Sequence, residues 1–108
     1  MDRDNISATA PPPDACTTMA DVRAGVDALD AALVALLVQR FGYMTAAARI
    51  KGDRGAVRDE ARKAQVLANV ARHAADAGLP PERLVAVWDA LVEQSIAFEF
   101  DVWDASRL

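Results

Sequence analysis

Arg40 and Lys51 are cations at positions where the sequence predicts buried apolar side chains. Between residues 19 and 51 the apolar positions recur in steps of four and three, as they do on one face of a helix, and the same steps continue to both cations. On a helix, their separation of eleven positions corresponds to about 16 Å along the axis and about 20° in azimuth. Two cations on one side of a helix are able to bracket a small dianionic ligand.

Ser95 and Glu99 interrupt a second apolar stripe in the same way. This stripe covers residues 84–102 in steps of three and four, and leucine would be expected at both polar positions. Because burying a charge costs free energy unless the charge is paired, two interpretations follow. Either Arg40 and Lys51 belong to an internal ion-pair network with Glu99, or these residues line a pocket for an anionic small molecule.

The elements that must position these residues are predicted to be three helices. Apolar periodicity predicts helices over residues 19–51, 58–77 and 80–104, with a turn at 52–55 and with Gly78 ending the second helix. A hydrophobic content of 53%, largely alanine, valine and leucine, fits an all-α fold. The first helix would be about 50 Å long, whereas a compact domain of this length is about 34 Å across. The first helix therefore requires a partner chain.

Composition narrows the class of protein. Residues 1–17 are polar, small and punctuated by prolines, so we expect a flexible arm before a helical domain over 18–108. A net charge of −4 argues against non-specific binding to nucleic acid. No stretch reaches the ~20 apolar residues of a membrane span, and the first residues lack the layout of a signal peptide. Cys16 is the single cysteine, which excludes an intramolecular disulfide and fits a reducing compartment, so we expect a cytoplasmic protein.

The charged residues of the first helix and their spacing resemble those of a known family. The matching residues of this helix are Asp21-Val22-Arg23, Val26-Asp27, Leu29-Asp30, Leu33, Leu37, Arg40 and Lys51. The similarity continues through Val57-Arg58-Asp59, Arg62, Ser95 and Glu99. On these residues the chain resembles the all-helical chorismate mutase family, which includes the isochorismate-pyruvate lyases. Asp14-Ala15-Cys16 ahead of the first helix looks like the lyase branch.

This resemblance implies an intertwined helical homodimer with two active sites, each built from both chains. It implies that Arg23 of the partner subunit and Arg40 bind the two carboxylates of the substrate. Lys51 would hydrogen-bond the ether oxygen of the breaking bond and also a carboxylate. Glu99 would lie on the other side of that oxygen.

Three further residues match supporting positions of the family. The resemblance implies that Ser95 and Arg62 lie near the ring carboxylate and that Asp59 lies at the edge of the pocket. The implied reaction is the isomerisation of chorismate to prephenate, an intramolecular rearrangement that requires no metal and no cofactor. Such an enzyme acts by orienting the enolpyruvyl arm over the ring and by stabilising negative charge on the ether oxygen.

Two residues depart from the family pattern. The best-known bacterial members have glutamine at the Glu99 position, and a glutamate donates a hydrogen bond only when protonated, so we expect a mutase that works better at mildly acidic pH. Lys63 stands where mutases often have a glutamate that binds the ring hydroxyl, unless Glu60 serves instead. A missing carboxylate favours the alternative of an isochorismate-pyruvate lyase making salicylate and pyruvate. A non-catalytic helical dimerisation module, with the cations in structural ion pairs only, is the other alternative.

The Glu99→Gln variant tests the role of protonation at this position. We expect higher mutase activity at neutral pH and a flatter pH profile, because an amide donates a hydrogen bond at every pH. Initial rates of chorismate consumption at pH 5 and pH 7.5 measure both effects. An unchanged pH profile with no gain at neutral pH would contradict the hypothesis.

Overall fold

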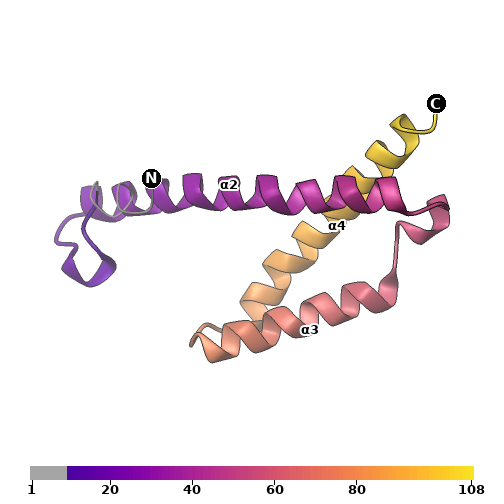
Figure 1. Ribbon diagram of the computed structural model, residues 1–108. Coiled ribbons are helices and arrows are strands. Elements are labelled where there is room, and N and C mark those ends of the chain that lie inside the picture. Colours follow the sequence, from indigo (N-terminus) through magenta and orange to yellow (C-terminus); the bar gives the residue numbers. More distant parts are fainter. Residues whose placement is uncertain (1–9) are drawn as a thin grey trace. The chain divides into compact units, whose positions relative to one another are not determined.

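Three helices account for most of residues 10–108, which the computed structural model describes (Figure 1). Their bounds are Met19–Ile50 for α2, Glu60–Asp76 for α3 and Pro81–Ala105 for α4, with single-turn 3₁₀ helices η1 at Pro13–Ala15 and η2 at Arg54–Ala56. The described part of the chain has no strand, and the prediction of an all-α fold with a long first helix is confirmed. Residues 1–9 of the predicted arm lie outside the described residues. No helix within the described range is long and apolar enough to cross a bilayer.

The chain divides into two units, one ending at Arg40 and the other formed by Phe41–Leu108. In the first unit the start of α2 is capped by a reciprocal pair of side chains. The backbone N–H of Asp21 donates to Thr18 Oγ1 at 3.1 Å, and Asp21 Oδ2 accepts from the backbone N–H of Thr17 at 3.1 Å. These bonds satisfy donors that a helix start leaves unpaired. The hydrogen bond from Thr17 also lowers the pKa of Asp21.

The apolar stripe of α2 is exposed within the first unit. Five side chains of this stripe keep 39–60% of their surface accessible: Val22, Val26, Leu29, Leu33 and Leu36. Fully burying an apolar side chain of this size is worth about 1.5–3 kcal/mol. Covering this surface would therefore add considerable stability to the helix.

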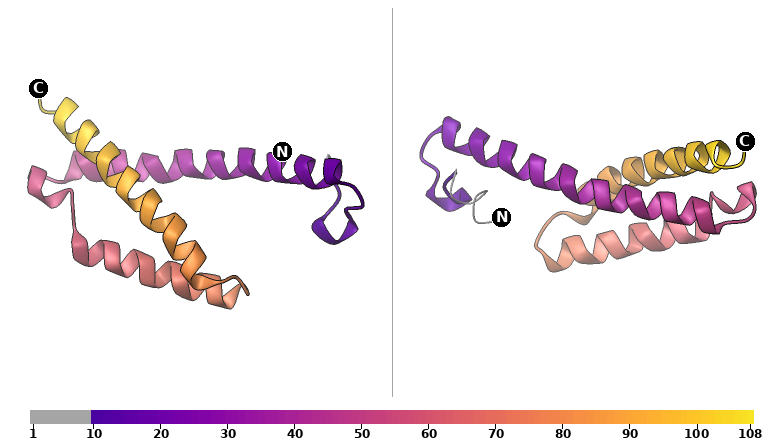
Figure 2. Two further views of the ribbon diagram at one scale, coloured as in Figure 1. Left: turned by 180° about the vertical axis from the view of Figure 1, so that it is seen from behind. Right: turned by 45° about the horizontal axis from the view of Figure 1, so that its top comes forward.

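In the second unit, α3 and α4 form a hairpin (Figure 2). The two helices converge at the short connection that follows α3 and diverge towards their other ends, and the last turns of α4 pass beside the last turns of α2 (Figure 1). The rings of Phe41 and Phe98 meet edge to face there, with centroids 5.0 Å apart. The apolar face predicted for α3 has no exposed residue: Val66, Leu67, Val70, Ala71 and Ala74. The second unit therefore has a small core of its own, whereas the first has none among its described residues.

Gly78 ends α3 as the sequence predicted. Its φ of +79° lies in the left-handed region, where a side chain clashes with the backbone. The backbone N–H of Leu79 donates to Ala74 O at 2.8 Å, and that of Gly78 donates to Ala75 O at 3.1 Å. This pair of bonds is the Schellman motif, which satisfies two carbonyls at the helix end.

The Gly78→Ala variant should lose about 1–2 kcal/mol of unfolding free energy. The cause is backbone conformation alone, because a Cβ at this position has no neighbour within 4 Å. Urea unfolding followed by circular dichroism measures the loss. Gly78→Asn is the matched control, since asparagine tolerates the left-handed region better than alanine does. Equal losses in both variants would contradict this explanation.

Candidate active site

Lys51 is the first residue beyond α2, and its side chain reaches α4. Its backbone N–H still donates to Ala47 O at 2.9 Å, so the hydrogen-bond pattern of the helix fixes the position of its backbone nitrogen. The ammonium Nζ lies 2.9 Å from Glu99 Oε2 and donates to Val57 O at 3.3 Å. Of the residues that the sequence singled out, Lys51 and Glu99 are thus brought into direct contact.

Glu99 is a buried carboxylate on an apolar helix face. The residue is only 3% exposed. Its Oε2 is paired with the Lys51 ammonium by distance, yet the approach lacks the angles of a hydrogen bond, and no other described residue donates to this oxygen. Since buried polar atoms are normally hydrogen-bonded, this oxygen retains capacity for a donor. The side chain of Lys51 is 29% exposed, so the pair is accessible from one side.

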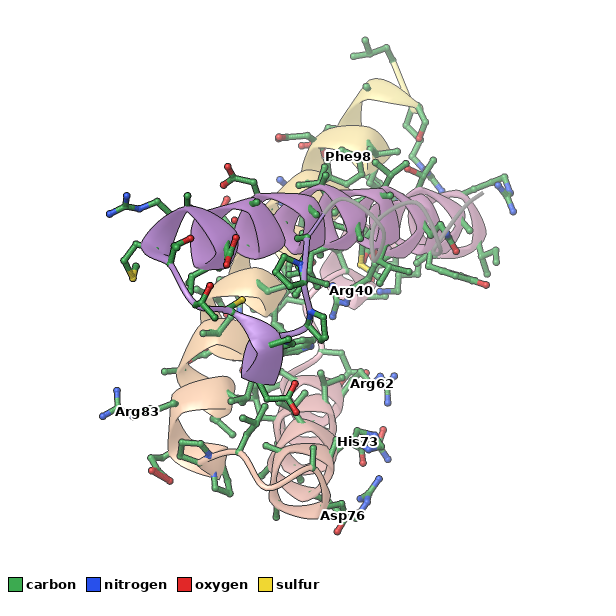
Figure 3. All side chains as sticks on the ribbon, turned by 90° about the vertical axis from the view of Figure 1, so that its left-hand side faces the viewer. Arg40, Arg62, His73, Asp76, Arg83 and Phe98 are labelled. Carbon is green, nitrogen blue, oxygen red and sulfur yellow. The ribbon has the colours of Figure 1, made fainter. Side chains whose placement is uncertain are left out.

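Ser95, Asp59 and Arg62 lie on the same unit as this pair. Ser95 is 3% exposed, one turn before Glu99, and its hydroxyl donates to Leu91 O at 2.7 Å. Asp59 caps α3, accepting from the backbone N–H of Arg62 at 3.0 Å. The guanidinium of Arg62 is exposed and projects from α3 on the side away from α4 (Figure 3).

Lys63 is held by carboxylates of α4. Its Nζ lies 2.8 Å from Asp89 Oδ1 and 2.7 Å from Glu93 Oε2. Arg58 contacts the same Glu93 at 2.6 Å and also Glu60 at 3.0 Å. Hydrogen bonds from Arg58, and next from Lys63, lower the pKa of Glu93 to about 2. Glu60, the residue considered as a substitute for the missing ring-hydroxyl carboxylate, is therefore already paired with a cation.

Arg23 and Arg40 lie on α2 in the first unit. Arg23 is exposed and Arg40 is half-buried. Their separation of seventeen positions corresponds to about 25 Å along the helix. One chain is therefore unable to bring both guanidinium groups to a single small ligand.

Trp103 and Arg107 contact the end of α2, and the sequence patterns did not assign them to the site. Trp103 Nε1 donates to Lys51 O at 3.0 Å. Arg107 donates to the same oxygen at 2.7 Å through Nη2 and to Ala48 O at 3.1 Å through Nη1. Trp103 lies one turn after Glu99 on α4, and Arg107 lies in the turn that follows the helix. No spacing in the sequence indicated these contacts, because their acceptors are backbone carbonyls.

Two comparisons with known proteins bear on these residues. Residues 22–100 match a family model described as chorismate mutase type II. The chain is also similar to the isochorismate pyruvate lyase of Pseudomonas aeruginosa, with 30% identity over 95 residues that cover 88% of this chain and 94% of that protein. Both findings confirm the resemblance inferred from the spacing of the charged residues.

Acid should weaken the hairpin through Glu93. The pKa of this carboxyl is about 2 in the folded chain against an ordinary value of 4.5, so its contribution to stability is complete above pH 4.5 and is lost as the pH falls towards 2. We expect Glu93→Gln to melt at a lower temperature than wild type at neutral pH, with the gap closing as the pH approaches 2. Thermal unfolding at several pH values measures this difference.

Asp101→Asn is the matched control for this prediction. Asp101 is exposed on the same helix and forms no ion pair with the described residues, so its loss should leave the pH dependence of the melting temperature unchanged. A constant gap between wild type and Glu93→Gln down to pH 2 would contradict the role of Glu93.

Proposed function

The chain belongs to the chorismate mutase type II family, and from this we propose that it catalyses the rearrangement of chorismate to prephenate. The observation that carries the proposal is the ion pair at 2.9 Å between Lys51 and the buried Glu99. Removing two charges from water costs free energy that an apolar pair would avoid, so this pair on an apolar face favours a functional role over a structural one.

In this proposal Lys51 acts on the ether oxygen of the substrate. The rearrangement breaks the C–O bond to the ring while the enolpyruvyl carbon forms a new C–C bond, and negative charge grows on the oxygen in between. An ammonium fixed beside that oxygen stabilises the transition state more than the ground state. Glu99 balances the ammonium before substrate binds and, when protonated, donates to the oxygen from the other side.

The two carboxylates of the substrate are assigned to arginines. We propose that Arg40 binds one and Arg23 of the partner subunit binds the other, since a guanidinium matches a carboxylate with two parallel hydrogen bonds. The exposed apolar stripe of α2 supports a partner chain, because burying it requires another surface. Holding both ends of the substrate fixes the enolpyruvyl arm over the ring.

Three residues of the second unit have supporting roles in this proposal. Ser95 is buried one turn from Glu99, so we assign its hydroxyl to the region of the ring carboxylate. Asp59 and Arg62 lie at the start of α3, where the capping bond between them fixes the first turn. We assign Arg62 to the same ring carboxylate and Asp59 to the rim.

An isochorismate-pyruvate lyase is the second candidate. It is favoured by the residues at this position, because the ammonium of Lys63 has no acceptor for the ring hydroxyl of chorismate and the carboxylate of Glu60 is paired with Arg58. The similarity to a lyase over most of both chains also favours it. This reaction breaks the same ether bond, while a ring hydrogen passes to the enolpyruvyl methylene, so that pyruvate and salicylate separate. The same cations would serve both reactions.

Incubation with each substrate separates these candidates. Purified protein is supplied with chorismate or with isochorismate at pH 5 and pH 7.5, and the products are resolved by chromatography. We expect prephenate from chorismate, because the proposal assigns Lys51 and Glu99 to the ether oxygen. Salicylate and pyruvate from isochorismate, with little prephenate, would assign the protein to the lyases instead.

Arg40→Leu is the control that distinguishes an enzyme from a dimerisation module. In an enzyme it should reduce turnover of either substrate by at least about a hundredfold while the dimer persists in analytical ultracentrifugation. In a module it should leave the protein folded and unchanged or more stable. Turnover of neither substrate by the wild-type protein would contradict both catalytic proposals.

A further inference from the structure

Three residues at the end of α4 and just beyond it contact the end of α2. Glu99 and Trp103 are four residues apart, which places them on one face of the helix, and Arg107 lies in the turn that follows Ala105. Glu99 pairs with the side chain of Lys51, whereas Trp103 and Arg107 donate to its carbonyl oxygen. The last turns of α4 and the turn after it therefore hold both the ammonium of Lys51 and its main chain.

The two donors satisfy carbonyls that a helix end leaves without partners. Arg107 donates to two of them, Ala48 O and Lys51 O, through the two terminal nitrogens of its guanidinium. A lysine ammonium has only one nitrogen and does not offer this forked geometry. Its guanidinium also lies 4.3 Å from the ring centroid of Trp103, so its position is fixed by stacking as well as by hydrogen bonds. A positive charge at the carboxyl end of a helix is favourable in addition.

Beyond Lys51, the next described contact of the chain with α4 is made by Arg54, which pairs with Asp104 at 2.8 Å. The residue directly after Lys51 is Gly52, which is exposed and has no neighbour within 4 Å of the position that a Cβ would take. Without the hydrogen bonds from Trp103 and Arg107, the main chain between Lys51 and Arg54 would be free to turn at Gly52, and the start of the Lys51 side chain would turn with it.

We propose that Trp103 and Arg107 are positioning residues, which fix the main chain of Lys51 so that its ammonium meets the ether oxygen of the substrate. This inference rests on the proposed function, since it assigns Lys51 to that oxygen. Orientation of this kind is sensitive to small shifts: a displacement of about 1 Å costs on the order of a hundredfold in rate. A merely structural clamp would change the melting temperature and leave turnover intact.

The first arm of the experiment measures steady-state kinetics of full-length variants with chorismate and isochorismate. We expect Arg107→Ala to lower kcat by about 10- to 100-fold with little change in KM. Trp103→Phe removes only the indole N–H and should lower kcat by about fivefold. Arg107→Lys keeps the charge without the two-pronged contact and should fall between wild type and Arg107→Ala.

The second arm observes Lys51 directly and does not depend on activity. The chain has only two lysines, Lys51 and Lys63, so protein labelled with ¹³C,¹⁵N-lysine gives two sets of lysine signals. We expect Arg107→Ala and Trp103→Phe to shift the Cε and Nζ signals of Lys51 and to speed exchange of its amide, while Lys63 stays unchanged. Arg83→Ala is the matched control, because Arg83 projects from the start of α4 on the side away from α3 (Figure 3) and should alter neither arm.

The outcomes separate this inference from the proposed function. Lower kcat together with shifted Lys51 signals, at an unchanged melting temperature, supports the positioning role. Unshifted Lys51 signals in Arg107→Ala and Trp103→Phe overturn it, whatever the rates are. If wild type converts neither substrate while the Lys51 signals shift in the variants, the proposed function fails. Trp103 and Arg107 then fix the main chain of Lys51 without a catalytic role.

Discussion

The ion pair between Lys51 and Glu99 is the constraint on which the second unit depends. A nearly buried carboxylate is tolerated only where its counter-charge is held in place. The holding contacts come from the Val57 carbonyl on one side and from Trp103 and Arg107 on the other. Loss of the Lys51 charge alone would leave the carboxylate of Glu99 buried and unpaired, which costs more than losing both charges. For this reason a change that removes one charge of the pair also disturbs the packing of the second unit.

Ion pairs also hold the segment between α2 and α3, which includes Val57. Arg54 contacts Asp104 at 2.8 Å and lies 4.5 Å from the ring centroid of Phe100, which ties η2 to α4. Arg58 ties the start of α3 to Glu93 on the same helix. Each of these pairs is partly exposed and contributes little by itself. Together they give the segment between α2 and α3 three charged or aromatic contacts with α4, although the chain as a whole carries a net negative charge.

The helices were predictable because their signals are local. Periodicity located each helix to within two residues, and Gly78 was recognisable because few other residues adopt its φ. The pairing of Lys51 with Glu99 was one of two interpretations of polar residues on apolar faces, and the structure contains it. The contacts of Trp103 and Arg107 left no such trace, because their acceptors are backbone carbonyls, which every residue carries. The meeting of Arg23 with Arg40 depends on a second chain and stays a prediction.

The exposed stripe of α2 makes the stability of this helix depend on whether another surface covers its apolar side chains. Its five apolar side chains keep 39–60% of their surface exposed, and the described part of the first unit has no buried residue to replace a partner's contribution. A helix of this kind gains stability from whatever binds its folded form. With a second copy of the chain as the partner proposed above, its melting temperature would rise with protein concentration, and dilution would destabilise the helix as heating does.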